Sequence, residues 1–184
     1  IVGSQFNDYF EIRTADYHGH GRGSDAKGGS HGKAFDTNER VIIDGSTGDN
    51  YYYIDSFRTE ITNGDGDNRY DIYVAEEAII TAANGRNNFD VRADEAVLST
   101  GDGDAVFKVD AGSSAEITTG TGDNEFYVEA DVATINAGDG DNQGRIKADV
   151  VTLNTGEGND SFRISGFDGH GKDDYGRESD RSHE

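Results

Sequence analysis

A motif of 18 or 19 residues repeats through most of this chain, and it constrains the fold more than any other feature. The copy from Gly120 to Ala137 reads GTGDNEFYVEADVATINA: a glycine-rich acidic turn, an alternating strand, a short corner and a second alternating strand. Repetition at a fixed period of this size indicates stacked structural units. The second glycine of each turn marks one copy, at Gly48, Gly66, Gly85, Gly103, Gly122, Gly140 and Gly158.

Ladders of similar side chains keep a constant distance from this marker glycine. Four residues after it stand the aromatic residues Tyr52, Tyr70, Phe89, Phe107, Phe126 and Phe162, with Gly144 as the one lapse. Five residues before it stand the aliphatic residues Ile43, Ile61, Ile80, Leu98, Ile117, Ile135 and Leu153. Alternation within each strand places such ladders on the inside. We expect the two 19-residue copies to absorb their extra residue at the corner between strands.

The sequence therefore predicts an all-β fold, a parallel β-solenoid of the β-roll kind. It should have about seven to eight coils of two short strands, with one acidic, glycine-rich turn per coil. We expect residues 1–14 to form a first half-coil, 15–40 a Gly/His-rich loop insertion, 41–166 the solenoid repeats and 167–184 a polar tail. The histidines of the insertion and the tail could bind a transition metal, but a solvated loop is the plainer interpretation.

Composition narrows the classes of partner. The formal net charge of −21 argues against nucleic acid and against anionic membranes. No apolar run approaches membrane-spanning length, so membrane insertion is not expected. Cysteine is absent, so no disulfide holds the turns. Stacked acidic turns would repel one another, and a divalent cation would remove that repulsion.

The turn sequence G-x-G-N-D-x-F-x-I, from Gly156 to Ile164, resembles the calcium-binding nonapeptide of the RTX family, whose repeats wind into a parallel β-roll. The longer period is similar to that of one-calcium-per-coil solenoids in RTX adhesins. The resemblance covers residues 41–166 and the half-motif at 5–14, and it implies secretion by type I export. Calcium takes six to eight oxygen ligands, and glycine lets a turn aim its carbonyls at the ion.

This chain departs from the family at one position. The family aspartate, two residues before the hydrophobic residue, is retained as Asp8 and Asp160, whereas the central coils carry Asn50, Asn68, Asn88, Ala105, Asn124 and Asn142 there. Aspartates stand one place earlier, and a second acid often precedes the glycine. The predicted Ca²⁺ ligands are Asp8, Asp49, Asn50, Asp65, Asp67, Asn68, Asp102, Asp104, Asp123, Asn124, Asp139, Asp141, Asn142, Glu157, Asn159 and Asp160.

The turn around Gly85 carries no carboxylate, and we expect Arg86 to replace a cation there or to pair with carboxylates of the flanking turns. A plainer alternative is that Gly-Asp-Asn segments are simply good turn formers. That alternative explains single Asp and Asn residues better than it explains acids on both sides of glycine.

The favoured function is an extracellular, calcium-binding structural protein rather than an enzyme, because no nucleophile and base recur together. Both ends of the repeat array carry the motif without a capping element, so head-to-tail self-assembly into a fibre, surface layer or biofilm matrix is expected. Cell-surface polysaccharide is a further candidate partner. Two alternatives stay open: a calcium-dependent repeat module of a larger secreted adhesin or enzyme, and an ice-binding solenoid that uses the Thr/Ser/Asn ladder of the second strand.

Overall fold

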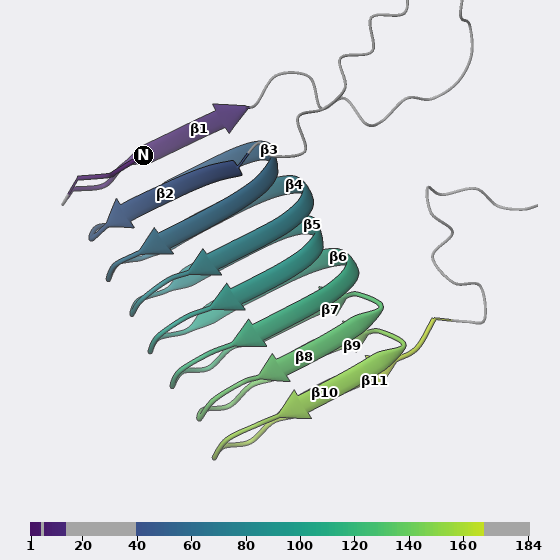
Figure 1. The fold of residues 1–184 in the computed structure, drawn as a ribbon. Helices are drawn as coiled ribbons and strands as arrows, with labels where there is room; N and C mark the ends of the chain where they lie inside the picture. The colour runs from purple at the N-terminus through teal and green to yellow at the C-terminus, as the bar shows by residue number, and fades with distance from the viewer. Residues whose placement is uncertain (5, 14–39, 168–184) are drawn as a thin grey trace, which may run out of the picture.

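The computed structural model describes residues 1–4, 6–13 and 40–167, and this part of the chain is a parallel β-solenoid without helices (Figure 1). The predicted fold class is confirmed. The strands are β1 (Tyr9–Arg13), β2 (Arg40–Ser46), β3 (Tyr51–Asn63), β4 (Asn68–Thr81), β5 (Asn87–Ser99), β6 (Ala105–Thr118), β7 (Glu125–Glu129), β8 (Val132–Asn136), β9 (Gln143–Lys147), β10 (Val150–Asn154) and β11 (Ser161–Ser165).

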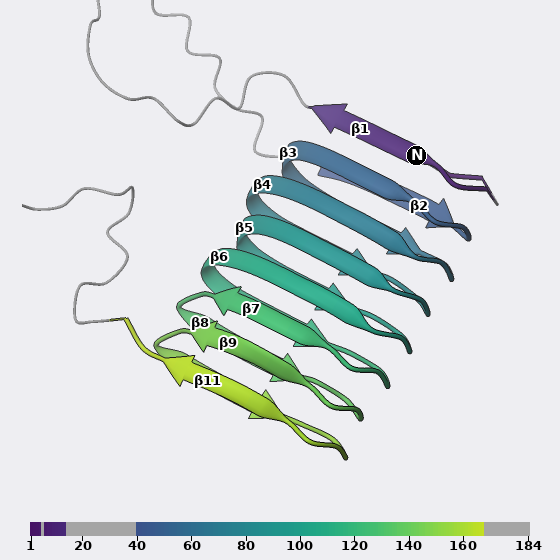
Figure 2. The same cartoon turned by 180° about the vertical axis from the view of Figure 1, so that it is seen from behind.

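The coils stack so that every neighbouring pair of strands is parallel. One face of the solenoid, here called the front face, follows the order β1-β3-β4-β5-β6-β7-β9-β11. The other face, the back face, contains β2, the second halves of β3 to β6, and then β8 and β10. Figures 1 and 2 show these faces from opposite sides, with the glycine-rich turns along one edge and the corners along the other.

The division of each coil into two short strands is correct for only part of the molecule. β7 to β10 have five residues each, but β3 to β6 have 13 or 14 residues and continue around the corner. In these longer strands the pairing with the next coil continues past the corner through a shift in register. Tyr52 pairs with Tyr70 before the shift and Thr59 with Ala78 after it. The extra residue of a 19-residue copy is therefore absorbed at the corner, as predicted.

The inward aromatic ladder forms the centre of the core. The rings of Tyr52 and Tyr70 stack 5.0 Å apart, and those of Phe89 and Phe107 stack 4.8 Å apart, nearly parallel in both pairs. At Gly144, where the ladder lacks an aromatic residue, the ring of Phe162 is inclined by 41° to the ring of Phe126, and the two ring centroids are 5.9 Å apart. A Cβ at Gly144 would lie 3.2 Å from the Phe162 ring. The Phe162 ring thus fills the space that the missing aromatic side chain leaves.

The first residues lie at the N-terminal end of the solenoid. β1 pairs in register with the first half of β3, and Val2 forms a parallel bridge with Asp44 on the back face. The Gly/His-rich insertion at 15–40 lies outside the described residues except for Arg40, which begins β2. The polar tail at 167–184 likewise lies outside them except for Phe167, so the histidines of both segments are not described.

Candidate functional site

The glycine-rich turns form the edge of the solenoid on which the predicted metal ligands gather. Each marker glycine has a positive φ, for example +149° at Gly66. A Cβ on Gly66 would lie 2.2 Å from the carbonyl oxygen of Gly48 in the preceding coil. Glycine is therefore required here both by the backbone conformation and by the close approach of adjacent turns. This close stacking brings equivalent side chains of successive turns beside one another.

A first ladder of side chains, the outer ladder, directly follows the marker glycines. Oδ1 of Asp49 accepts a hydrogen bond from the Asp67 N–H at 2.8 Å, and Oδ1 of Asp123 accepts one from the Asp141 N–H at 2.8 Å. Each carboxylate thus binds the main chain of the following coil. The members of the outer ladder are Asp49, Asp67, Arg86, Asp104, Asp123, Asp141 and Asn159, all of them exposed.

A second ladder directly precedes the marker glycines and follows the same rule. Asp65 accepts from the Asn84 N–H at 3.0 Å, and Asp139 accepts from the Glu157 N–H at 2.8 Å. Asp102 accepts from the Thr121 N–H at 2.9 Å. That backbone hydrogen bond, together with one from the Thr121 side chain, lowers the pKa of the Asp102 carboxyl. Of the predicted ligands, Asp65, Asp102, Asp139 and Glu157 belong to this ladder.

Four of the five predicted asparagine ligands lie elsewhere, inside the turns. Asn50, Asn68, Asn124 and Asn142 are buried, and they form a column of amides along the interior of this edge. Oδ1 of Asn68 accepts from the Asn50 N–H at 2.9 Å, while Nδ2 of Asn68 donates to the Gly66 carbonyl at 2.8 Å. A buried amide requires such partners. The Asn68 amide oxygen is thus already used inside the protein.

Acidic residues occupy both ends of this asparagine column. Oδ1 of Asp160 accepts from the Asn142 N–H at 3.0 Å, while Asp8 accepts from the Ser4 N–H at 2.6 Å. The two positions that retain the family aspartate are therefore equivalent to the buried asparagines. In this molecule their carboxylates bind the backbone of a turn.

Two details of the turn around Gly85 differ from the sequence interpretation. The residue in the asparagine column is Asn87, which is fully buried, whereas Asn88 is exposed. Asn87 stands two residues after the marker glycine Gly85, as the other column members stand after theirs, and this spacing identifies it from the sequence. Arg86 donates its main-chain N–H to Oδ1 of Asp67 at 2.7 Å, but its guanidinium makes no ion pair with the part of the chain that the structure describes. The expected pairing of Arg86 with flanking carboxylates is wrong for these residues.

The outer and second ladders provide carboxylate oxygens, which are suitable calcium ligands, but these oxygens do not surround a single point as a complete coordination site would. Each aspartate in them uses Oδ1 on the neighbouring coil, and in the outer ladder within residues 40–167 its Oδ2 makes no hydrogen bond. No group of three or more His, Cys, Asp or Glu side chains converges as a metal site among the described residues. An ion at this edge would combine carboxylate oxygens of two adjacent turns with carbonyls and water, which are ordinary calcium ligands.

The back face carries the ladder considered for ice binding. The Ser99 hydroxyl donates to the Thr81 hydroxyl at 3.3 Å, and Asn154 donates to Oδ1 of Asn136 at 2.8 Å. These side chains bond to one another along the ladder. Val97 is 38% exposed on the same face, beside Glu116 of the next coil, so the polar surface is interrupted.

Comparisons with known proteins give no family for this chain. No family model matches it, and neither a curated protein nor a solved structure gives a significant match. None of the described segments is a helix long and apolar enough to cross a membrane.

Proposed function

We propose that this chain is a structural solenoid whose copies stack end to end, so that β11 of one copy pairs with β1 of the next. The observation that carries the proposal is the match between the two ends. Among the described residues, β1 pairs with β3 alone and β11 pairs with β9 alone, so each leaves one edge unpaired. An unpaired parallel edge is a template for another strand.

The two edge strands occupy the same positions in the repeat. Phe162 and Ile164 point inward from β11 as Phe10 and Ile12 do from β1, and so stacking would continue the aromatic and aliphatic ladders. The outward position is Arg163 in β11 and Glu11 in β1. Neighbouring copies would therefore place opposite charges on adjacent strands, which favours this pairing.

The back face supports the same arrangement. Ile1 stands at the inward aliphatic position, and the Gly3 N–H donates to the Asp44 carbonyl at 2.6 Å. Residues 1–3 thus add part of a strand beyond β2. The coil that β11 begins has no back-face strand among the described residues. In a stack, residues 1–3 of the next copy would take that place and lie against β10 of the preceding copy.

Exposure at the C-terminal end indicates what stacking would gain. Ile164 is 50% exposed, although its equivalent one coil earlier, Ile146, is 1% exposed. Covering the end coil removes such apolar surface from water, which is favourable. A head-to-tail contact between identical copies does not close on itself, so the product is a filament.

Electron microscopy and sedimentation velocity over a concentration series test this proposal. The wild-type protein should form rods that lengthen with concentration, and Ile164→Lys should stay monomeric. Val97→Lys is the matched control, because Val97 is exposed on a face in the middle of the solenoid, and it should still form rods.

A charge exchange provides a second test. Glu11→Arg and Arg163→Glu should each weaken assembly, and mixing the two variants should restore it. A wild type that stays monomeric at every concentration would overturn stacking. That result would favour a module that acts within a larger secreted protein.

We also infer that the turn edge binds Ca²⁺, and the observation that favours it is the free Oδ2 on outer-ladder aspartates that stack on adjacent turns, such as Asp104, Asp123 and Asp141. Bound calcium would neutralise carboxylates held on adjacent turns. Asp65, Asp67, Asp102, Asp104, Asp123, Asp139 and Asp141 would hold it, whereas the buried asparagines would not. Calcium binding at this edge is consistent with an extracellular protein, because the calcium concentration is high outside the cell.

Thermal unfolding tests the calcium proposal separately from stacking, because it can use the monomeric Ile164→Lys variant. Millimolar CaCl₂ should raise the melting temperature more than MgCl₂ at equal ionic strength. Equal shifts with both salts would reduce the effect to charge screening and contradict a calcium site.

A further inference from the structure

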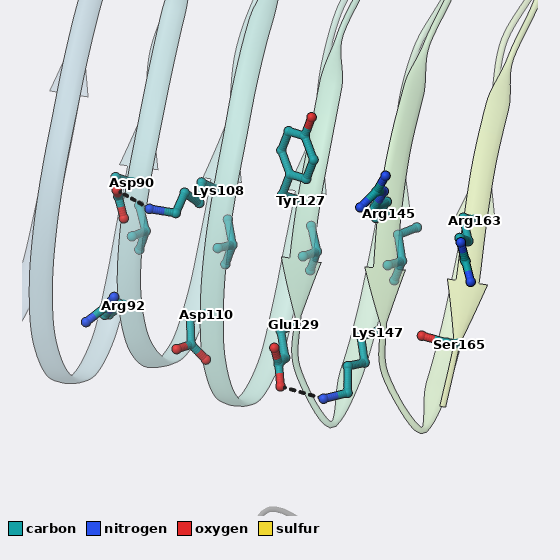
Figure 3. A pocket seen from close by; sticks show the side chains of 14 residues that line it. Asp90, Arg92, Lys108, Asp110, Tyr127, Glu129, Arg145, Lys147, Arg163 and Ser165 are labelled. Carbon is teal, nitrogen blue, oxygen red and sulfur yellow. Dashed lines mark hydrogen bonds and ion pairs between the residues drawn. The ribbon is translucent and has the colours of Figure 1, made fainter. Parts of the chain in front are cut away.

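A shallow groove lies on the outward side of the front face, apart from the turn edge. It has a volume of about 440 Å³, and its lining comes from β5, β6, β7, β9 and β11 (Figure 3). It therefore crosses successive coils along the axis of the solenoid. A groove of this form suits an extended chain better than an enclosed small molecule.

Most acidic side chains of the groove already have a cationic partner. Lys108 donates to Asp90 at 2.8 Å, and Lys147 donates to Glu129 at 3.2 Å, as the dashed lines in Figure 3 mark. Within each pair, the positive charge of the lysine balances the negative charge of the carboxylate. Arg92 stands opposite Asp110 on the next strand, whereas Arg145 and Arg163 have no acidic residue opposite them on the described neighbouring strands.

Arg145 and Arg163 stand opposite each other on adjacent strands, β9 and β11. Neither guanidinium makes a hydrogen bond or an ion pair within the described ranges of the chain. Like charges on directly opposite residues destabilise a sheet. The chain has 37 acidic residues against 16 basic ones, so two adjacent arginines without an acidic partner are unexpected unless something else binds them.

Tyr127 precedes these arginines in the same ladder, at the position opposite Arg145 on β7. Its side chain is 43% exposed, and its hydroxyl donates to the Glu125 carboxylate on the same strand. That bond holds the ring in one orientation with a face toward solvent. An aromatic face packs on the C–H groups of a sugar ring, and a guanidinium binds a carboxylate through two parallel hydrogen bonds.

We propose that this groove binds a linear anionic polysaccharide that carries uronate carboxylates. The Tyr127 ring packs on one sugar, and Arg145 binds the carboxylate of that sugar or its neighbour. Where β11 is not covered by a second copy, Arg163 extends the contact by one coil. The site does not depend on end-to-end stacking, because Glu11 of a following copy would reach Arg163 and leave Arg145 available.

The Tyr127 ring beside the arginines favours a sugar chain over duplex nucleic acid as the occupant, because a duplex presents its phosphates and groove edges and not an open ring face. Duplex DNA also binds through many cations at once. Here two free arginines lie in a chain of net charge −21. Duplex DNA is therefore included in the test as the competing ligand.

Isothermal titration calorimetry tests the proposal with three probes: a galacturonate hexamer, its methyl ester and duplex DNA. The protein should be the Ile164→Lys variant, so that failure of stacking does not affect the result. The hexamer should bind, and the neutral ester should bind about tenfold more weakly because the charge-assisted bonds are lost. Circular dichroism in the same buffer confirms that each variant is folded.

Substitutions assign the roles of the two principal residues. Arg145→Gln should weaken hexamer binding about tenfold and leave the ester unaffected, whereas Tyr127→Ala should weaken both. Arg69→Gln and Tyr53→Ala are matched controls on the front face outside the groove, and they should bind as the parent does. The proposal fails if the hexamer does not bind, if Arg145→Gln binds it as the parent does, or if DNA binds more tightly.

Discussion

Tyr52 donates its hydroxyl hydrogen to Oδ1 of Asn63 across the interior of one coil, at 3.0 Å. Asn63 in turn donates from Nδ2 to the Tyr70 hydroxyl at 3.1 Å. All three side chains are buried. A Cβ at Gly45 would lie 1.8 Å from the Tyr52 hydroxyl oxygen, so glycine provides the space for it. This polar cluster occurs where the aromatic ladder has tyrosine instead of phenylalanine, and it favours one register of the coils over a shift by one repeat.

Removing Asn63 should therefore destabilise the solenoid. Asn63→Ala leaves the Tyr52 hydroxyl without its acceptor, and an unpaired buried polar group costs about 1–3 kcal/mol. Adding Tyr52→Phe and Tyr70→Phe to Asn63→Ala should recover part of that loss, because the hydroxyls are then gone. Urea denaturation measures both effects.

The control for this series is Asn154→Ala on the exposed ladder of the back face, which should change stability by less than about 0.5 kcal/mol. If the triple variant is as unstable as the sum of its single changes, the three residues do not act as a cluster.

Alkaline pH should unfold the protein through the same tyrosines. Burial raises the pKa of both Tyr52 and Tyr70, and a hydrogen bond to Asp71 raises the pKa of Tyr51 to about 12. The unfolded chain loses these protons near pH 10, before the folded chain does. The stabilisation is thus complete below about pH 10 and is lost as the pH rises through the folded values.

The combined Tyr52→Phe and Tyr70→Phe variant tests this pH dependence. Its melting temperature should fall less steeply than that of the wild type between about pH 10 and pH 12. An identical slope in both proteins would mean that other groups control alkaline unfolding.

Much of the fold could be predicted because each coil repeats the same packing problem. The ladders at Tyr52 and Ile61 recur in every copy, and strand alternation then fixes which side chains are inside. The path of the corners could not be predicted, because whether β3 continues through Ser56 to Arg58 depends on contacts with the next coil.

The turn residues show where sequence reasoning reaches its limit. Asp67 and Asn68 are adjacent, and both offer oxygen to a cation, yet the first is exposed and the second is buried. Their directions follow from the positive φ of Gly66, which the spacing of acids does not reveal. The groove at Tyr127 and Arg145 was missed because each residue alone is an ordinary outward side chain, and the pairing of strands brings them together.

The stacking of the turns should not tolerate a side chain at Gly66. Gly66→Ala forces an alanine into a φ of +149° and places its Cβ 2.2 Å from a backbone oxygen, which should cost about 1–3 kcal/mol. Gly166→Ala is the control, because its Cβ would meet its nearest atom at 3.9 Å. Urea denaturation of both variants measures the difference, and equal midpoints would contradict the close approach of the turns.

Asp123, an outer-ladder aspartate, has two roles that substitutions can separate. Asp123 accepts a hydrogen bond from the Asp141 N–H, and it also carries a charge between Asp104 and Asp141. Asp123→Asn keeps an oxygen for the bond and removes the charge, whereas Asp123→Ala removes both. Without calcium, Asn should be at least as stable as the wild type because repulsion is relieved, and Ala should lose about 1 kcal/mol.

With calcium the ranking of the stabilities should change, because the wild type has a carboxylate that binds the ion and Asp123→Asn lacks its charge. The rise in melting temperature on adding calcium should be smaller for Asp123→Asn than for the wild type, and differential scanning calorimetry measures it. Asp131→Asn, at an exposed corner, is the control and should show the full rise. An equal rise in Asp123→Asn would remove this ladder from the calcium site, and equal stability of the Asn and Ala variants would show that the bond to the Asp141 N–H contributes nothing.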